Sequence, residues 1–473
     1  MWFLDNSLSL WRRKLLENLI IKPWYWRLFP LENKTGSDIF ASLFLSDHHI
    51  CTLLESPNIL SSENKHLARY SICAGKPRHI DGKLQMWTPS IGNILPFLKQ
   101  LLQREKLQND EFNSEEIAKL PFTGGWLGWL GYDLAYEIER LPKIKPDLLP
   151  FPVAYWYEPE NFAVLDHWEQ KLWIATTNPE DLDIFEQKLT QKKEMKEEII
   201  KSDKIAYLTN KEDYEKAVIQ AKRYIEKGDI FQANLSLRFS TKTNGNSWEI
   251  YSKLQKINPS PYSSYWQTPW GNMMSCSPER LILVKDRIIE TRPIAGTRSR
   301  GKTLQLDQKL RAELLSNKKE RAEHIMLVDL ERNDLGKVCK FGTVEVDELL
   351  TIEKYSHVMH LVSNIRGEMR EDCNVIEVIK GVFPGGTITG CPKIRCMEII
   401  EELEPFRRSL FYGSCGYLDM RGNLDLNILI RTLLSQDNIV WGQVGAGIVA
   451  DSDPEKEWYE SLEKAQAQLI ALQ

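Results

Sequence analysis

The stretch Glu290-Thr291-Arg292-Pro293-Ile294-Ala295-Gly296-Thr297-Arg298 decides the fold of this chain. It predicts a β-strand that turns at its proline and glycine. Three further motifs occur around it in a fixed order: Cys276-Ser277-Pro278-Glu279 before it, and Phe383-Pro384-Gly385-Gly386-Thr387-Ile388-Thr389-Gly390 and Gly445-Ala446-Gly447-Ile448-Val449 after it. One such motif could arise by chance, but four in this order point to one kind of protein.

The four motifs together resemble those of the chorismate-binding enzymes. This family includes anthranilate synthase component I, aminodeoxychorismate synthase component I, and the isochorismate and salicylate synthases. The resemblance is strong from residue 210 to 469 and weaker before. It implies an α+β fold like that of anthranilate synthase component I, in which two antiparallel β-sheets form a sandwich flanked by helices, with two interleaved domains.

The composition bounds the class of protein. A chain of 473 residues predicts two or three domains, or one large interlocked one. The net charge of -5 predicts no general attraction to nucleic acid. The eight cysteines contain no Cys-x-x-Cys pair, which favours free thiols in a reducing compartment. Residues 1–30 do not resemble a signal peptide, and no apolar run reaches about 18 residues, so we expect a soluble cytoplasmic protein without a membrane span.

Local patterns predict mixed strands and helices. Short apolar runs between turns predict strands from 40 to 180, and the run of Lys and Glu at 186–204 predicts a solvated helix or linker. We place the domain boundary there, with an N-terminal domain at 1–205 and a chorismate-binding catalytic domain at 206–473. The capping-box pattern Thr209-x-x-Glu212 predicts the start of a helix that ends at Gly228. Further strands are expected at 230–239, 281–285, 288–291, 413–418, 426–433 and 444–449, and helices at 318–328, 375–382, 392–403 and 454–469.

Two acidic pairs are candidate metal ligands. Glu320 and Glu323 are three residues apart on one predicted helix, and Glu457 and Glu460 repeat this spacing on the last helix. Such a pair by itself is usually a solvated helix face. Carboxylates from two helices, together with a substrate carboxylate, nevertheless suit Mg²⁺, which prefers oxygen ligands. The resemblance implies that Glu323 and Glu460 bind the metal directly and that Glu320 and Glu457 act through water.

The dianionic substrate implied by the resemblance needs fixed cations and backbone N–H groups. The candidates are Arg431, which can bind a carboxylate with two hydrogen bonds, Lys464, and the glycines that permit close backbone approach, Gly386, Gly445 and Gly447. The family often carries Tyr at the position of Phe411. Tyr412 lies beside it, so either ring could contact the substrate.

Two residues match the family's proton-handling groups. Glu279 matches the acid that protonates the leaving C4 hydroxyl, a role that requires burial or like-charge neighbours to keep the carboxyl group protonated. His360 lies in an apolar run, where a lone histidine is usually part of the core. The resemblance gives it a supporting role in orienting substrate or in proton removal.

Two positions distinguish the subfamilies. Gln232 stands where the water-using relatives carry a lysine base, so we expect ammonia as the nucleophile. In the stretch Pro293-Ile294-Ala295-Gly296-Thr297 of the first motif, Ala295 occupies the position of a lysine that, in typical aminodeoxychorismate synthases, adds to ring C2 and directs ammonia to C4. Alanine cannot do this, which leaves C2 open to ammonia and predicts anthranilate after loss of pyruvate.

Other functions stay open at this point. The stretches at 122–133 and 383–390 resemble the aminodeoxychorismate branch, whose product is 4-amino-4-deoxychorismate for para-aminobenzoate and folate. An isochorismate synthase is disfavoured by Gln232. A non-catalytic subunit that binds chorismate or tryptophan is disfavoured because all five candidate acidic residues are present.

The resemblance also implies partners. The chain has no recognisable glutaminase nucleophile, so ammonia from glutamine would come from a separate amidotransferase subunit, component II. Two segments resemble those that line a tryptophan site in anthranilate synthases, and they contain Leu54, Glu55, Ser56, Pro259 and Tyr262. Tryptophan could be an inhibitor or a structural ligand there.

Overall fold

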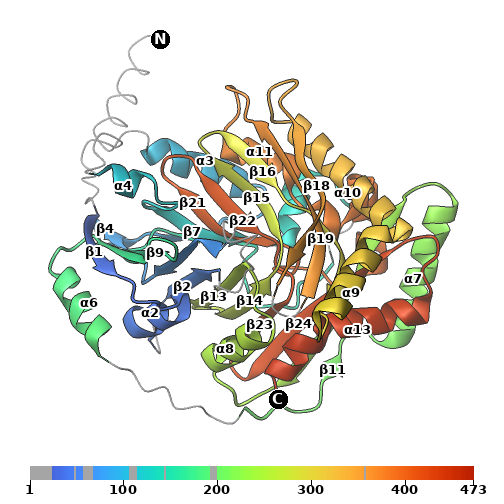
Figure 1. Cartoon of the computed structure of the whole chain (residues 1–473), viewed down its shortest axis with the longest axis horizontal. Helices are drawn as coiled ribbons and strands as arrows, with labels where there is room; N and C mark the ends of the chain where they lie inside the picture. Colours follow the sequence, from blue (N-terminus) through green and yellow to red (C-terminus); the bar gives the residue numbers. More distant parts are fainter. Residues whose placement is uncertain are drawn as a thin grey trace, which may run out of the picture.

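The structure is a computed structural model, which describes residues 24–46, 50–56, 68–105, 114–142, 145–191, 200–355 and 358–473 (Figure 1). Residues 1–23, which include most of the stretch that we compared with a signal peptide, lie outside these ranges. So does part of the predicted domain boundary, residues 192–199. No helix in the described ranges is long and apolar enough to cross a membrane.

The larger of two antiparallel sheets has twelve strands and runs through the whole molecule. Its strands come from both ends of the chain. In spatial order they are β1 (Tyr25–Pro30), β10 (Lys171–Thr176), β9 (Asn161–Asp166), β3 (Tyr70–Ala74), β2 (Cys51–Glu55), β13 (Tyr262–Thr268), β14 (Gly271–Ser277), β23 (Thr432–Gln436), β24 (Ile439–Ile448), β12 (Gln232–Lys242) and β11 (Ala206–Tyr207), with β20 (Gly390–Cys391) also paired to β12.

The second sheet has ten strands and also mixes both halves of the sequence. In order they are β17 (Ile294–Ser299), β19 (Val358–Glu368), β16 (Ile288–Thr291), β15 (Arg280–Lys285), β22 (Leu424–Asn427), β21 (Ser414–Asp419), β7 (Gly125–Leu130), β8 (Ala154–Tyr157) and β6 (Met86–Trp87), with β18 (Glu345–Lys354) paired to β19. A two-stranded ribbon consists of β4 (His79–Ile80) and β5 (Lys83–Leu84).

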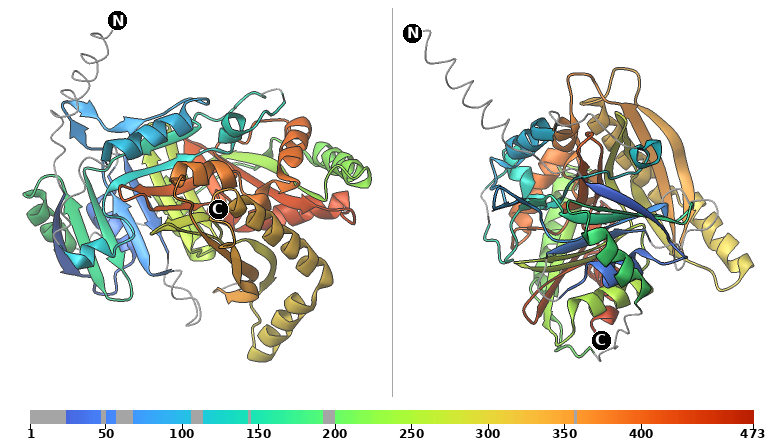
Figure 2. Two further views of the ribbon diagram at one scale, coloured as in Figure 1. Left: turned by 90° about the horizontal axis from the view of Figure 1, so that it is seen from above. Right: turned by 90° about the vertical axis from the view of Figure 1, so that its left-hand side faces the viewer.

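Helices lie around the two sheets. The main ones are α2 (Gly36–Leu43), α3 (Ile94–Glu105), α6 (Asp181–Thr190), α7 (Lys211–Glu226), α8 (Ser247–Ile257), α9 (Leu304–Ser316), α10 (Lys318–Gly336), α11 (Val375–Val382), α12 (Lys393–Leu403) and α13 (Pro454–Ala471). Shorter turns are α4 (Glu115–Ala118), α5 (Ala135–Ile138), η2 (Tyr132–Leu134) and η3 (Gly386–Ile388). Helices α7 and α13 pack side by side, whereas α9 and α10 stand out from one flank beside β17 and β19 (Figures 1 and 2).

The space between the sheets is filled by large apolar side chains. Trp129 and Tyr155 of the smaller sheet pack in one cluster with Trp266 of the larger sheet, and all three are buried. Aromatic side chains of this size contribute most of the buried area in such a core. The predicted α+β sandwich of two antiparallel sheets is therefore observed.

Several local predictions are confirmed. Helix α11 and strand β16 have the predicted limits, and α13 begins at the predicted proline, where a missing N–H costs nothing. All eight cysteines are free. The domain boundary between residues 205 and 206 stays a prediction, since both sheets contain strands from both sides of it.

Several boundary predictions were wrong, and the helix expected at 318–328 continues to Gly336 as α10. Helix α7 is capped by Asn210 rather than Thr209, because the Asn210 side chain accepts the N–H of Asp213. The apolar run predicted as one strand at 426–433 forms two strands in different sheets, β22 and β23. Arg431 separates them with a φ of 53°, a left-handed conformation that breaks the strand.

Candidate active site

A bulge in β17 brings the first motif to the site. The register of β17 against β19 shifts between Ala295 and Thr297, and Gly296 adopts a φ of +74° there. A side chain at Gly296 would be strained and would lie 2.9 Å from Leu314 Cδ1. The bulge places the hydroxyl of Thr297 at 2.9 Å from Nδ1 of His360 on β19.

His360 is buried beside this hydroxyl. Burial, the largest cause, and the positive charge of Arg431 lower the pKa of His360 to about 4, while a hydrogen bond with the Gly296 backbone opposes the shift. The ring of Tyr355 packs edge-on at 5.4 Å. His360 is therefore a neutral imidazole at pH 7, held in place by Thr297.

Glu279 follows β14 and is almost completely buried, at 5% exposure. Its Oε1 accepts the backbone N–H of Ile294 at 3.4 Å, which joins the second motif to the first. Burial, the largest cause, and the carboxylate of Glu331 raise the pKa of Glu279 to about 8, while the hydroxyl of Thr387 lowers it in part. A carboxyl group in this environment is protonated at neutral pH, as a general acid must be.

Glu331 of α10 was missed in the sequence. Its Oε2 accepts the hydroxyl of Thr291 at 3.2 Å, and it accepts the backbone N–H of Gly386. Burial raises its pKa to about 7, against the opposing charge of Lys393. A glutamate eight residues beyond Glu323 on a helix has no distinguishing local pattern, so only the packing of α10 reveals it.

Gln232 and Glu323 meet directly. Nε2 of Gln232 lies 2.8 Å from Oε1 of Glu323, although the two residues are on β12 and α10. Gly447 on β24 leaves room for this contact, because a Cβ there would lie 2.3 Å from Nε2 of Gln232 and 3.4 Å from Oε1 of Glu323. A side chain at position 447 would therefore displace the Gln232 amide.

Two of the other candidate metal ligands form ion pairs. Glu320 binds Arg298 at 2.8 Å, while its Oε2 is buried without a hydrogen-bond partner. Glu460 binds Lys464 at 2.9 Å, and Glu457 is buried. Within the described part of the chain, no three His, Cys, Asp or Glu side chains form a metal-ligating group.

The side-chain chemistry of the four carboxylates suits a divalent cation, although the structure does not bring three of these described residues into one ligating group. Glu320 has a buried oxygen that lacks a partner, and an acceptor in this state is costly unless a cation or water satisfies it. All four are hard oxygen ligands of the kind that Mg²⁺ prefers.

The predicted clamp residues lie close together at β24. Nη1 of Arg431 donates to the carbonyl of Lys464 at 2.7 Å, and Nζ of Lys464 lies 3.3 Å from the carbonyl of Gly445. A Cβ at Gly445 would lie 2.9 Å from the hydroxyl of Tyr412. Arg431 is partly buried, and the loss of solvation lowers its pKa.

The two adjacent aromatic residues, Phe411 and Tyr412, have different surroundings. Tyr412 directs its hydroxyl to the clamp, whereas the Phe411 ring lies 5.6 Å from the guanidinium of Arg238. Tyr412 is therefore the ring beside Gly445. Gly386 begins η3 next to Glu331, and a Cβ there would lie 2.6 Å from Leu330 Cδ2.

The residues predicted for tryptophan lie at a separate cavity of ≈ 140 Å³. Leu54, Glu55, Ser56 and Tyr262 line it, but Pro261 lines it in place of the predicted Pro259. The Glu55 carboxylate already accepts hydrogen bonds from the hydroxyl groups of Ser37 and Tyr251 at 2.7 and 2.6 Å. A cavity of roughly 150 Å³ accommodates one benzene-sized ring, so a whole tryptophan requires it to widen.

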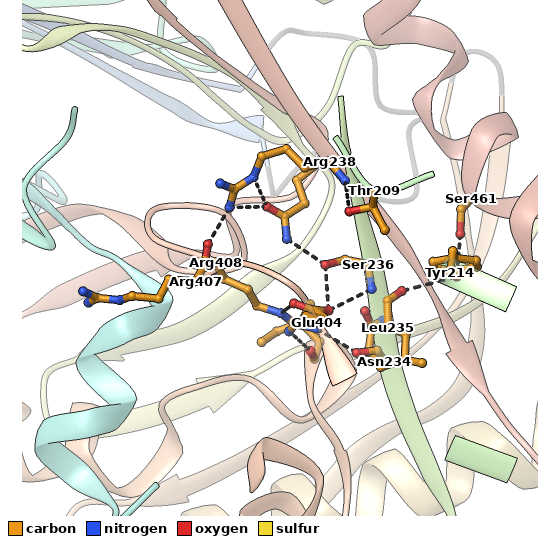
Figure 3. A network of polar contacts seen from close by, with 12 residues as sticks. Thr209, Tyr214, Asn234, Leu235, Ser236, Arg238, Glu404, Arg407, Arg408 and Ser461 are labelled. Carbon is orange, nitrogen blue, oxygen red and sulfur yellow. Dashed lines mark hydrogen bonds and ion pairs between the residues drawn. The ribbon is translucent and has the colours of Figure 1, made fainter. Parts of the chain in front are cut away.

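A larger, open cavity of ≈ 630 Å³ lies between α7 and the C-terminal end of α12. Its lining, as far as the described residues show, includes none of the predicted site residues. Ser236 and Glu404 form part of its wall and belong to a buried polar network (Figure 3).

Comparison with solved structures defines the class of fold. The crystal structure of anthranilate synthase component I from Streptococcus pneumoniae TIGR4 superimposes with a TM-score of 0.74, at 29% identity, over 92% of this chain and 99% of that chain. The predicted fold, like that of anthranilate synthase component I, is thus confirmed.

Sequence comparison identifies the family. The chorismate binding enzyme family matches residues 56–469, and the chain belongs to it. An anthranilate synthase component I-like protein of Synechocystis sp. is 58% identical over all of this chain and 96% of that protein. Aminodeoxychorismate synthase component 1 of Bacillus subtilis is 46% identical over 74% of this chain and 77% of that protein.

Proposed function

We propose that this chain aminates chorismate with ammonia in a magnesium-dependent reaction and then eliminates pyruvate to give anthranilate. The observation that carries this proposal is the hydrogen bond from Gln232 to Glu323. An amide at this position cannot remove a proton from water, so the nucleophile must already have an available lone pair at neutral pH. Ammonia has one.

The first half-reaction is a substitution with a shift of the double bonds. The nitrogen lone pair forms a bond to ring C2, the ring π electrons move, and the C4–O bond breaks. Glu279 supplies the proton with which the C4 hydroxyl leaves as water, a role that its raised pKa supports. Ala295 offers no competing nucleophile at C2.

The second half-reaction makes the ring aromatic. The C2 proton is lost and the C3–O bond breaks, and the enolpyruvyl group leaves and takes up a proton as pyruvate. His360 is a neutral imidazole in the site, so it can orient the substrate or accept this proton.

The four carboxylates Glu320, Glu323, Glu457 and Glu460 would hold the magnesium ion. When bound, the ion supplies a positive charge that neutralises the ring carboxylate and polarises the leaving group. Arg431 and Lys464 would hold the second carboxylate, with the backbone of Gly445 and Gly447 beside them.

Ammonia would come from a glutamine amidotransferase subunit, component II. The printed names of the relatives as component I or 1 support a two-part enzyme. A cytoplasmic location is part of the proposal, since eight free cysteines suit a reducing compartment. Tryptophan remains the proposed ligand of the cavity lined by Leu54 and Tyr262.

One assay tests the reaction. The purified chain is incubated with chorismate, Mg²⁺ and ammonium, and anthranilate fluorescence is recorded together with pyruvate. The proposal requires both products, and both must depend on Mg²⁺ and ammonium. Conversion that does not need ammonium contradicts it.

A second candidate is aminodeoxychorismate synthase component I. The 46% identity to the Bacillus subtilis protein favours it. In this case the assay gives 4-amino-4-deoxychorismate, and no pyruvate is released. The same experiment therefore separates the two candidates.

A further inference from the structure

Arg408 is a buried cation that no catalytic step uses. It lies five residues beyond the end of α12, and its exposure is 1%. Nε donates to Oε2 of Glu404 at 2.9 Å, and Nη2 donates to Oε1 at 2.7 Å, so the pair is joined by two parallel hydrogen bonds (Figure 3). Buried ion pairs with this geometry are specific in orientation.

The remaining donors of Arg408 hold two segments of the site. Nη2 donates to the carbonyl of Asn234 on β12 at 2.7 Å, and Nη1 donates to the carbonyl of Ile388 at 2.8 Å. Asn234 is the register partner of Gly447, and Ile388 ends the turn that begins at Gly386. One guanidinium thus joins the strand and the turn on which candidate site residues lie.

The guanidinium also lies over two tyrosine rings. Its distance to the ring centre is 4.6 Å for Tyr412 and 4.7 Å for Tyr132. Tyr412 has a φ of 65°, which is strained for a tyrosine and persists only where surrounding contacts fix it. The Tyr412 N–H donates to the carbonyl of Leu429 at 2.9 Å, so backbone and ring are both held.

Glu404 fixes the pair to β12. Its Oε1 accepts both the N–H and the hydroxyl of Ser236, each at 2.8 Å. Ser236 is the register partner of Gly445, the glycine that the Tyr412 hydroxyl faces. Through Glu404, Arg408 is therefore held against β12, and β12 pairs with β24, the strand that carries Gly445 and Gly447.

We propose that Arg408 is a positioning residue for the substrate clamp: it fixes the Tyr412 ring against Gly445 and fixes the Gly386–Ile388 turn, without contacting substrate itself. This inference rests on the proposed function of the clamp. A lysine cannot replace the arginine, because an ammonium group lacks the planar surface and the fixed fork of donors that reach Glu404, Asn234 and Ile388 together. A positive charge alone at position 408 therefore cannot hold all three partners.

The test combines Arg408→Lys with Tyr412→Phe, singly and together, and follows KM for chorismate, kcat and the melting temperature. Arg78→Lys is the matched control. Arg78 is also a buried arginine, with a buried glutamate partner at 2.6 Å and an aromatic ring at 4.9 Å, but it lies in the N-terminal part away from the clamp.

We expect Arg408→Lys and Tyr412→Phe each to raise KM for chorismate about tenfold with a smaller change in kcat, and the double variant to raise it much less than the product of the two single effects. Non-additivity of this kind shows that two residues act through one contact. Arg78→Lys should lower the melting temperature comparably and leave KM unchanged.

Three results would overturn the inference. They are an unchanged KM in Arg408→Lys, effects of the two substitutions that multiply, and an equal rise of KM in Arg78→Lys. If Arg408→Lys does not fold, Tyr412→Phe tests the inference. An unchanged KM in that variant would show that the Tyr412 hydroxyl has no role in the clamp, and the inference would be rejected. Failure of the wild-type chain to convert chorismate would reject the proposed function instead.

Discussion

The side-chain amide of Gln232 donates to the carboxylate of Glu323 across 2.8 Å, and this contact joins the nucleophile position to the proposed metal site. The two residues are 91 positions apart and come from β12 and α10. Gly447 lies against both side chains and leaves space that any other residue would fill. In the proposed function, this hydrogen bond would couple the choice of nucleophile to the binding of the metal.

Substitution Gln232→Lys should change the nucleophile. A lysine beside Glu323 can act as a base toward water, so ammonia-dependent product should fall at least about tenfold and isochorismate should form without ammonium. Chromatography of the products measures both. Gln232→Met is the control, since it removes the hydrogen bond without adding a base. It should form no isochorismate. Formation of isochorismate in both variants would contradict this explanation.

Glu279 should set an alkaline limit to activity. Its folded-state pKa is raised to about 8, so the protonated acid predominates below this pH and is lost as pH rises through it. The logarithm of kcat/KM should fall above about pH 8. Glu331→Gln removes a nearby negative charge that raises this pKa, so the alkaline limit should move to lower pH. A shift to higher pH in this variant would disprove the assigned electrostatics.

His360 should produce no step in the pH profile between about pH 5 and 8. Its pKa is lowered to about 4, so the ring is neutral throughout this window and becomes charged only below it. Thr297→Val removes the hydrogen bond at Nδ1, worth about 1 kcal/mol, and should lower kcat/KM about fivefold. Titration of the His360 ring by NMR near pH 6.5 would refute the prediction.

Gly447→Ala should impair catalysis without unfolding the chain. The added methyl group would lie 2.3 Å from the movable end of Gln232, so that side chain shifts and its bond to Glu323 is lost. We expect ammonia-dependent turnover to fall about tenfold, with a melting temperature close to that of the wild type. Gly336→Ala is the control, because nothing lies within 4 Å of the added atom.

Substitution of a metal ligand should be more severe. Glu323→Gln removes one negative charge from the proposed magnesium site, and kcat/KM should fall by about 100-fold or more. A titration with Mg²⁺ measures whether the half-saturating concentration rises in parallel. Activity that is independent of Mg²⁺ in the wild type would reject the metal assignment altogether.

Much of the fold could be predicted because motifs and apolar periodicity are local signals. Strand β16 and helix α11 were located to the residue. Glu279 could be proposed because it lies in a recognisable motif, and Glu323 because of its spacing from Glu320 and the family resemblance. The split of 426–433 could not be predicted, because the left-handed backbone at Arg431 depends on the two sheets that meet there.

The contributions of Glu331 and Arg408 could not be predicted either. Each is a charged residue in an ordinary helical or loop segment, and its role depends on distant partners such as Thr291 and Asn234. Similarly, the sequence could not decide between Phe411 and Tyr412. The choice follows from the backbone conformation, which directs only one ring toward Gly445.

The stoichiometry of the reaction tests the central claim most directly. Chorismate consumed, anthranilate formed and pyruvate released should be measured together in the presence of Mg²⁺ and ammonium chloride. We expect equal amounts of all three, and no consumption when either Mg²⁺ or ammonium is left out. Consumption of chorismate without ammonium, or an aminated product without pyruvate, would contradict the account.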